Sequence, residues 1–380
     1  MRVLIGAFCF PFAVSLILAA APAQETQNTQ AALPKDVYPE TFSRLQQQIR
    51  GGLGGAAAIR LHGSQGNVRF QSSVGRDLTE LAILTTAREH DQPYEWSLHE
   101  MEAIAVGLDP AVIDVVRHRK PLPGIGEKES AIVQVGREIF GKHKLSSETY
   151  ARALKLFGER DLVDLVDLMG NYAGTSARLT VFNQHMPPGW KQFLPLPFTP
   201  PDDIHPDSRS RLPLIQRPTP ASATPPALYS RPLAPEGTGP AHIRRHGAGL
   251  KSLEASVGRR LMELAILVTA REHDLQYEWT MTEPAALKDG LEPAIIDLVR
   301  LRKPVTGLAE KDAALIDLGR EVFRKHFVSS ETYARALKAF GERDLVDLVD
   351  LMGQRAADEV LLIVFDQQLF PDQKPLLPIP

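Results

Sequence analysis

The sequence has a single cysteine in 380 residues, Cys9, and it lies in an apolar segment at the N-terminus. We predict below that this segment is removed, which leaves a mature chain without a thiol. Such a chain forms no disulfide and no thiolate metal site, and it has no cysteine redox chemistry. The scarcity of cysteine therefore excludes these classes of protein.

The sequence also lacks a strong excess of charge of either sign, since its formal net charge is −3. Lysine and arginine form no cluster of the kind that favours a nucleic-acid partner. There is no glycine-rich phosphate loop, no nucleophile elbow and no HxxxH or HxH pair, so we predict no cofactor and no metal. His90 and His273 each precede an aspartate, and we assign them to structural hydrogen bonds at helix ends.

Runs of alternating β-branched residues are absent as well, whereas apolar residues recur at helical spacing. Leucines and alanines in the segment 78–85 fall on one face, at intervals of three and four residues. Ser146 has a residue type typical of helix N-caps, and Gly107, Gly158 and Gly170 stand where helices are expected to end. The sequence therefore predicts an all-α fold.

The N-terminus has the layout of a secretory signal peptide over residues 1–23. Arg2 precedes an apolar run from residue 3 to 20, and Ala21-Pro22-Ala23 offers a small-x-small cleavage site. We expect a periplasmic or secreted protein with no membrane association after cleavage, and an uncleaved anchor is the alternative. Residues 24–35 are then expected to form a disordered tail.

The chain contains an internal duplication. Residues 74–90 match 257–273 at 14 of 17 positions, and residues 146–170 match 329–353 at 24 of 25. Such identity predicts two tandem domains of one fold. The predicted organisation is domain 1 at 36–195, a proline-rich linker with the lead-in arm of the second repeat at 196–240, and domain 2 at 241–380.

One segment differs between the repeats in a way that bears on chemistry. PYEWSLHE, residues 93–100, corresponds to QYEWTMTE, residues 276–283, but only the first contains a histidine. Pro93 is favoured in the first turn of a helix, which puts Glu95 and His99 at positions i and i+4 on one face. A carboxylate at that spacing can orient and charge an imidazole, so we predict an acid–base pair. A solvated pair without function is the alternative.

The order of motifs in both repeats resembles a known family. ELAIL, then YEWxxHExxA, then FGERxLVxLVxLMGxY is similar to the carboxymuconolactone decarboxylase family, which has the alkylhydroperoxidase D-like fold. The resemblance covers residues 36–195 and 203–378, and it implies two such helical domains in tandem. It also implies a homo-oligomer, in which three two-repeat chains form a pseudo-hexamer.

The resemblance assigns roles to individual residues. Family members that act as peroxidases have a CxxC motif, a histidine four residues after its second cysteine and a glutamate fifteen residues before that cysteine. Here these positions hold Gln92, Glu95, His99 and Glu80, so both sulfur atoms are missing. Attack on a peroxide bond needs a thiolate, and we therefore do not expect peroxidase activity. Glu80, Glu95 and His99 remain as candidate catalytic residues.

The second repeat departs further from the family pattern. Glu263 and Glu278 match the two glutamates of repeat 1, but Thr282 stands at the histidine position. Without an imidazole this copy lacks its best general acid. We therefore expect a degenerate second site, and we predict a structural role for repeat 2.

The decarboxylases of the family imply a cofactor-free loss of CO₂ from a small carboxylated or lactone substrate. His99 would donate the proton, and Arg76 or Arg88 would bind a substrate carboxylate. Tyr94 and Trp96 are further candidates for substrate contacts, and core packing is the alternative for both. One hypothesis is therefore a decarboxylase or isomerase without a cofactor. The other is a non-catalytic, exported binding or scaffold protein.

Overall fold

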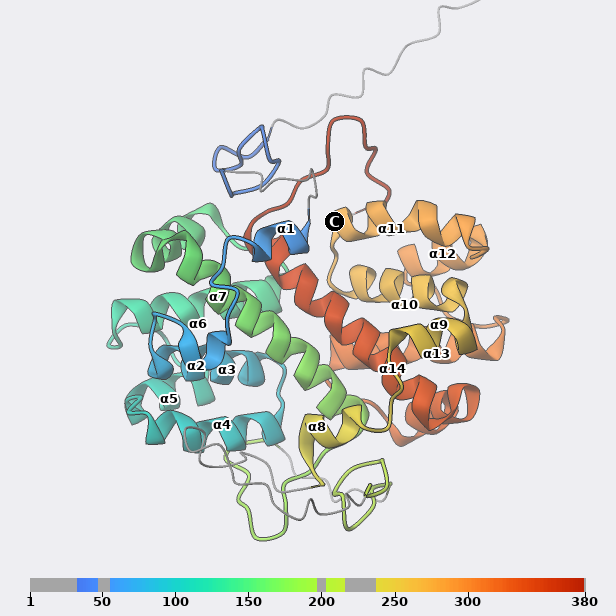
Figure 1. Ribbon diagram of the computed structural model, residues 1–380, viewed down its shortest axis with the longest axis horizontal. Coiled ribbons are helices and arrows are strands. Elements are labelled where there is room, and N and C mark those ends of the chain that lie inside the picture. The colour runs from blue at the N-terminus through green and yellow to red at the C-terminus, as the bar shows by residue number, and fades with distance from the viewer. Residues whose placement is uncertain (1–32, 47–54, 197–202, 216–236, 379–380) are drawn as a thin grey trace, which may run out of the picture. The chain divides into compact units, whose positions relative to one another are not determined.

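Figure 1 shows the computed structural model of the chain, which describes residues 33–46, 55–196, 203–215 and 237–378. The signal peptide predicted at 1–23 lies outside these ranges, as do residues 24–32 of the predicted tail. Residues 197–202 and 216–236, which together make up most of the predicted linker at 196–240, also lie outside them. All of the described residues belong to one unit, Leu33–Pro380.

The described ranges are largely helical and contain two isolated bridges in place of a sheet, which confirms the all-α fold class. The helices of repeat 1 are α1 (Ala56–Arg60), α2 (Val68–Gln71), α3 (Arg76–Glu89), α4 (Pro93–Ala105), α5 (Pro110–Arg117), α6 (Glu127–Lys142) and α7 (Ser147–Val181). Those of repeat 2 are α8 (Gly239–Arg244), α9 (Leu250–Val257), α10 (Arg259–Glu272), α11 (Gln276–Lys288), α12 (Pro293–Arg300), α13 (Glu310–Arg320), the π-helix η1 (Glu321–Lys325) and α14 (Ser330–Val364). Each helix from α3 to α7 thus has a counterpart in repeat 2.

Capping residues explain several helix boundaries. Ser146 precedes α7, and its hydroxyl accepts a hydrogen bond from the backbone N–H of Thr149 at 3.2 Å, so the predicted helix start is confirmed. Gly107 follows the end of α4 with φ 91°, as predicted. Gly158 has non-helical φ 74° and ψ 169° and separates two helical segments of α7, so a helical segment ends there as predicted. The prediction for Gly170 is wrong, because this residue lies in the interior of the second segment.

A helix–helix contact explains why a glycine stands at position 170. The long helices α7 and α14 run side by side, one from each repeat (Figure 1). A Cβ atom on Gly170 would lie 2.7 Å from the carbonyl oxygen of Ala357, and one on Gly174 would overlap the carbonyl of Gly353. Small residues therefore let the two backbones approach closely, and the contact joins the repeats.

Short arms also join the repeats: residues 36–45 before repeat 1 and residues 203–212 before repeat 2. The backbone N–H of Arg44 donates to the carbonyl of Phe365 at 2.7 Å, beyond the end of α14. The backbone N–H of Arg211 donates to the carbonyl of Phe182 at 2.8 Å, beyond the end of α7. Each arm therefore binds the long helix of the other repeat, so the two repeats are interlocked.

None of the helices in the described ranges is both long enough and apolar enough to cross a membrane. The longest, α7 and α14, carry aspartates along their length and pack against each other.

Candidate functional site

Helices α3 and α4 bring the three candidate catalytic residues together. Glu80 lies on α3, and Glu95 and His99 lie one turn apart on α4. His99 Nδ1 is 2.7 Å from Glu80 Oε2, and its Nε2 is 3.2 Å from Glu95 Oε1. All three side chains are at most 5% exposed. The imidazole is thus held between two carboxylates in a buried site.

The electrostatics of the site favour a charged imidazole. Burial by itself lowers the pKa of His99, but the carboxylates of Glu80 and Glu95 outweigh it, and the net shift is upward. For Glu80, a carboxylic acid, burial by itself raises the pKa. His99 and Arg69 overcome this effect and lower the pKa of Glu80 to about 2. Because both ring nitrogens face carboxylate oxygens, both can donate only when the ring is protonated.

Two residues of the site were not predicted from the sequence. Arg69 on α2 contacts Glu80 with its Nε at 2.8 Å from Oε1. Tyr172 on α7 packs edge-on against the His99 ring at 4.9 Å between centroids, and burial raises its pKa. Neither residue is shared by the repeats, since Ser252 and Arg355 stand at the equivalent positions. This difference between the repeats was the signal in the sequence that could have pointed to Arg69 and Tyr172.

The four predicted substrate-binding residues have different surroundings. Arg76 belongs to the site, since its Nη2 lies 3.0 Å from Glu80 Oε1. Arg88 instead donates to the carbonyl of Arg117 at 2.8 Å and pairs with Asp91.

The two aromatic candidates, Tyr94 and Trp96, are buried in the core, 1% and 0% exposed. The Tyr94 hydroxyl forms a hydrogen bond with Thr238 Oγ1 at 2.9 Å, and Trp96 Nε1 donates to Glu100 at 2.5 Å. Their surroundings in the structure therefore match the alternative of core packing.

The equivalent region of repeat 2 has different chemistry. Thr282 is buried at the histidine position, and Glu278 lies 3.4 Å from Arg355 Nη1. Burial and the charge of Glu359 raise the pKa of Glu278 to about 7. Burial also raises the pKa of Glu263. Repeat 2 thus has glutamates of raised pKa, whereas repeat 1 has an imidazole beside Glu80, whose pKa is lowered.

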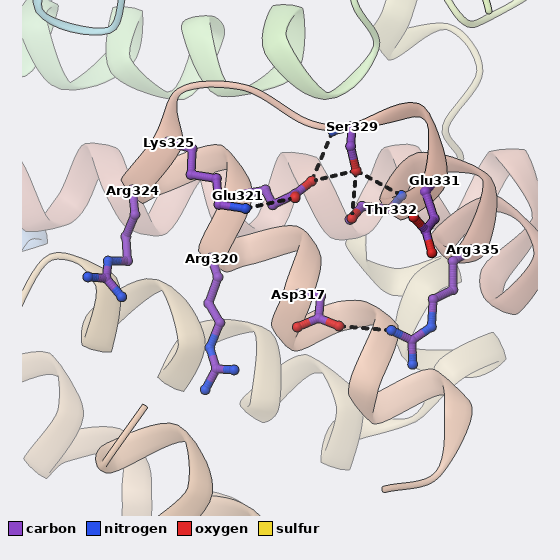
Figure 2. Close-up of a pocket in the computed structure, with 9 residues that line it drawn as sticks. All are labelled: Asp317, Arg320, Glu321, Arg324, Lys325, Ser329, Glu331, Thr332 and Arg335. Carbon is purple, nitrogen blue, oxygen red and sulfur yellow. Dashed lines mark hydrogen bonds and ion pairs between the residues drawn. The ribbon is translucent and has the colours of Figure 1, made fainter. Parts of the chain in front are cut away.

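Figure 2 shows a pocket of about 640 Å³ at the surface of repeat 2, formed by α13, η1 and the start of α14. Most of its acidic groups have partners. Asp317 lies 2.8 Å from Arg335 Nη1, while Glu321 accepts from the backbone N–H of Ser329 at 2.9 Å and pairs with Lys325. The carboxylate of Glu321 therefore serves to cap α14, and the pocket contains none of the candidate catalytic residues.

The helix-end histidines behave as predicted. His90 ends α3 with its Nδ1 2.8 Å from the carbonyl of Thr86, and His273 ends α10 in the same way at 3.0 Å from Thr269. Across the described ranges, no group of three or more histidine, cysteine or acidic side chains has the arrangement of a metal site.

The chain was compared with family models, with curated proteins and with solved structures, and none of them matches it. The class of protein defined by the described residues is therefore an all-α protein with duplicated sequence and a buried Glu–His–Glu cluster in its first repeat.

Proposed function

We propose that the chain is an exported, cofactor-independent acid–base enzyme of the decarboxylase or isomerase type, as the resemblance to the carboxymuconolactone decarboxylase family suggests. Its substrate would be a small carboxylated or lactone compound bound in repeat 1. The observation that carries the proposal is the imidazole of His99 between Glu80 and Glu95, at 2.7 Å and 3.2 Å. A buried imidazole with a raised pKa is suited to donate a proton near neutral pH.

In the proposed reaction, Glu80 accepts from Nδ1 and fixes the orientation of the ring. Nε2 then donates its proton to carbon. For a decarboxylation, the bond between the carboxylate and the α-carbon breaks, CO₂ leaves, and the electron pair passes into a conjugated carbonyl. His99 protonates the resulting carbanion, and a proton from solvent restores the imidazolium. Glu95 faces the same nitrogen and can receive or return that proton in an isomerisation.

The test is turnover of a panel of γ-lactone acids by the wild type, by His99→Gln and by Thr282→Ala. Glutamine keeps one hydrogen bond to the surrounding carboxylates, so it disturbs folding less than alanine does. We expect His99→Gln to reduce kcat by a factor on the order of 10² to 10⁴, the usual contribution of a general acid. Thr282→Ala is the matched control in repeat 2 and should leave kcat unchanged. Unchanged turnover in His99→Gln would contradict the role of His99 as the general acid.

The second candidate is a non-catalytic binding or scaffold protein. The observation that favours it is the burial of the cluster, since Glu80, Glu95 and His99 are at most 5% exposed. On this hypothesis the cluster only stabilises the contact of α3 with α4. Absence of turnover by the wild type over the whole panel, together with loss of stability in His99→Gln, is the result that supports it.

A further inference from the structure

Two short helices, α1 and α8, carry the same motif in the two repeats. Residues 59–63 read IRLHG, and residues 243–247 read IRRHG. The histidines of these motifs form equivalent ion pairs: His62 Nδ1 with Glu159 Oε1 at 2.7 Å, and His246 Nδ1 with Glu342 Oε1 at 2.6 Å. Arg60 and Arg244 are therefore equivalent residues of the two repeats.

In repeat 1 the arginine is fixed by two carboxylates. Arg60 Nε lies 2.6 Å from Asp167 Oδ1 on α7, and its Nη1 lies 2.6 Å from Asp358 Oδ1 on α14. The guanidinium thus has a carboxylate of each repeat as a partner, and its charge is neutralised. Arg60 serves to join the repeats.

Arg244 has neither of the two carboxylate partners that Arg60 has. The counterpart of Asp167 is Asp350, which pairs with Arg178, a position held by Leu361 in the other repeat. The counterpart of Asp358 is Thr175, which has no charge. Arg244 is exposed, and it forms no hydrogen bond or ion pair with any residue that the structure describes. The duplication has therefore left one of two equivalent guanidinium groups without an ion pair among the described residues.

The start of α8, the helix that carries Arg244, contacts α4, which carries Glu95 and His99. Thr238, directly before α8, forms a hydrogen bond with the hydroxyl of Tyr94 at 2.9 Å, and Tyr94 adjoins Glu95 on α4. The backbone N–H of Gly239, the first residue of α8, donates to Gln184 at 2.9 Å. Figure 1 shows α8 beside α7, at the end of the molecule where α4 lies.

The electrostatics agree with this placement. The Arg244 side chain reaches solvent, but its partial burial and the neighbouring Arg178 lower its pKa, while the charges of Asp350 and Glu95 act in the opposite direction. Two guanidinium groups thus lie near one aspartate, Asp350, whose ion-pair partner is Arg178. Within the site, three carboxylates (Glu80, Glu95 and Glu102) are balanced by Arg69, Arg76 and a protonated His99. Arg244 therefore adds a positive charge that no ion pair among the described residues balances.

We propose that Arg244 binds the carboxylate of the substrate at the repeat 1 site, so that a residue of repeat 2 completes the site of repeat 1. A guanidinium binds a carboxylate through two parallel hydrogen bonds, which fixes orientation as well as charge. Arg76 and Arg88, the arginines suggested by the sequence, already have carboxylate partners. This inference rests on the proposed function, because it assigns a substrate group to the same site.

The test compares each γ-lactone acid of the panel with its methyl ester, in the wild type, Arg244→Ala, Arg244→Lys and Arg60→Ala. We expect the wild type to prefer the acid by about 100-fold in kcat/KM, the size of effect typical of a charged hydrogen-bonded pair. Arg244→Ala should lose this preference, mainly through a higher KM, and Arg244→Lys should keep part of it. Arg60→Ala is the matched control, and it should lose thermal stability while keeping the preference.

A binding measurement separates this inference from the proposed function. Calorimetry follows binding of the same acids to His99→Gln, with and without Arg244→Ala. If the wild type turns over the acids and Arg244→Ala still prefers the acid to its methyl ester, the role of Arg244 is contradicted and the proposed function is retained. Binding that depends on Arg244, without turnover by the wild type, supports the inference and overturns the function. Neither turnover nor Arg244-dependent binding overturns both.

Discussion

At the scale of single residues, the environment of His99 decides what the cluster can do. The two glutamates are present in both repeats, but only in repeat 1 do they have an imidazole between them. With the imidazole, Glu80 is ionised and its pKa is lowered to about 2. In repeat 2, where Thr282 replaces the ring, burial and the charge of Glu359 raise the pKa of Glu278 to about 7. Burial also raises the pKa of Glu263, the counterpart of Glu80, so the pKa of the equivalent glutamate shifts in opposite directions in the two repeats.

This coupling gives a prediction for Glu80→Gln. Glu80 is the strongest of the groups that raise the pKa of His99, so glutamine should lower that pKa. A raised histidine pKa stabilises the fold fully below pH 6.5, and the contribution is lost as pH rises through the folded value. His99 can donate a proton only while its ring is protonated. As pH rises, the activity of Glu80→Gln should therefore be lost at a lower pH than the activity of the wild type. The pH dependence of kcat/KM and an NMR titration of the His99 ring measure the shift.

The control for this prediction is Glu263→Gln, the same substitution in repeat 2. It removes a carboxylate that has no imidazole beside it, and it should leave the pH profile unchanged. A His99 titration that is the same in Glu80→Gln and in the wild type would contradict the electrostatic coupling.

At the scale of helices, the contact of α7 with α14 depends on residues without side chains. Gly174 faces Gly353, and Gly170 faces the backbone of Ala357. The two helices form the most extensive contact between the repeats, and each also packs against the core helix of its own repeat, α3 or α10. Close packing of this kind tolerates little added volume.

We predict that Gly174→Ala destabilises the protein. A Cβ atom at this position overlaps the carbonyl of Gly353, and backbone on both sides has to move. Overpacking of this type costs about 1–3 kcal/mol in the free energy of unfolding, measured by urea denaturation. Gly141→Ala is the control, because a Cβ there meets nothing within 4 Å and alanine favours a helix. Equal stability of the two variants would contradict a tight contact at Gly174.

At the scale of the whole folded unit, four histidines meet between the repeats. The His90 and His326 rings are 5.2 Å apart, and the His143 and His273 rings are 5.5 Å apart. Burial lowers the pKa of His90 to about 3 and the pKa values of His143 and His273 to about 4, and it also lowers the pKa of His326. Neighbouring charges of both signs surround them: Asp91, Asp274, Arg119 and Arg302.

This arrangement predicts acid sensitivity of the contact between the repeats. Since the folded pKa values lie below 6.5, the unfolded chain binds more protons between pH 6.5 and about 4, and stability falls as pH falls through that window. Each histidine contributes at most about 1.4 kcal/mol per pH unit. His143→Asn with His326→Asn should flatten the dependence, measured by denaturation midpoints at several pH values. Asparagine tolerates their left-handed backbone.

The control for the acid prediction is His118→Asn, which removes a histidine whose side chain is 42% exposed. It should leave the pH dependence of stability unchanged. A double variant that loses stability with falling pH as steeply as the wild type would show that the interface histidines are not responsible.

Much of the fold and part of the site could be predicted from the sequence. Helical periodicity gave the all-α class, and the N-cap at Ser146 was correct because capping depends on neighbours in the chain. Gly170 was wrongly assigned to a helix end because its role depends on α14, which lies far along the chain. Arg69 was missed for the same reason, since nothing in α2 itself indicates a contact with Glu80.

The sequence by itself determined the duplication, the helices and the i, i+4 spacing of Glu95 and His99, because these depend on residue type and on short-range geometry. Only the tertiary structure decided which carboxylate reaches Nδ1 of that ring, since Glu80 comes from another helix. The fold also determines that Arg60 has two carboxylate partners while Arg244 has no ion pair among the described residues, because the relevant aspartates lie on helices distant in the chain. Charge balance at a buried site depends on contacts between distant segments.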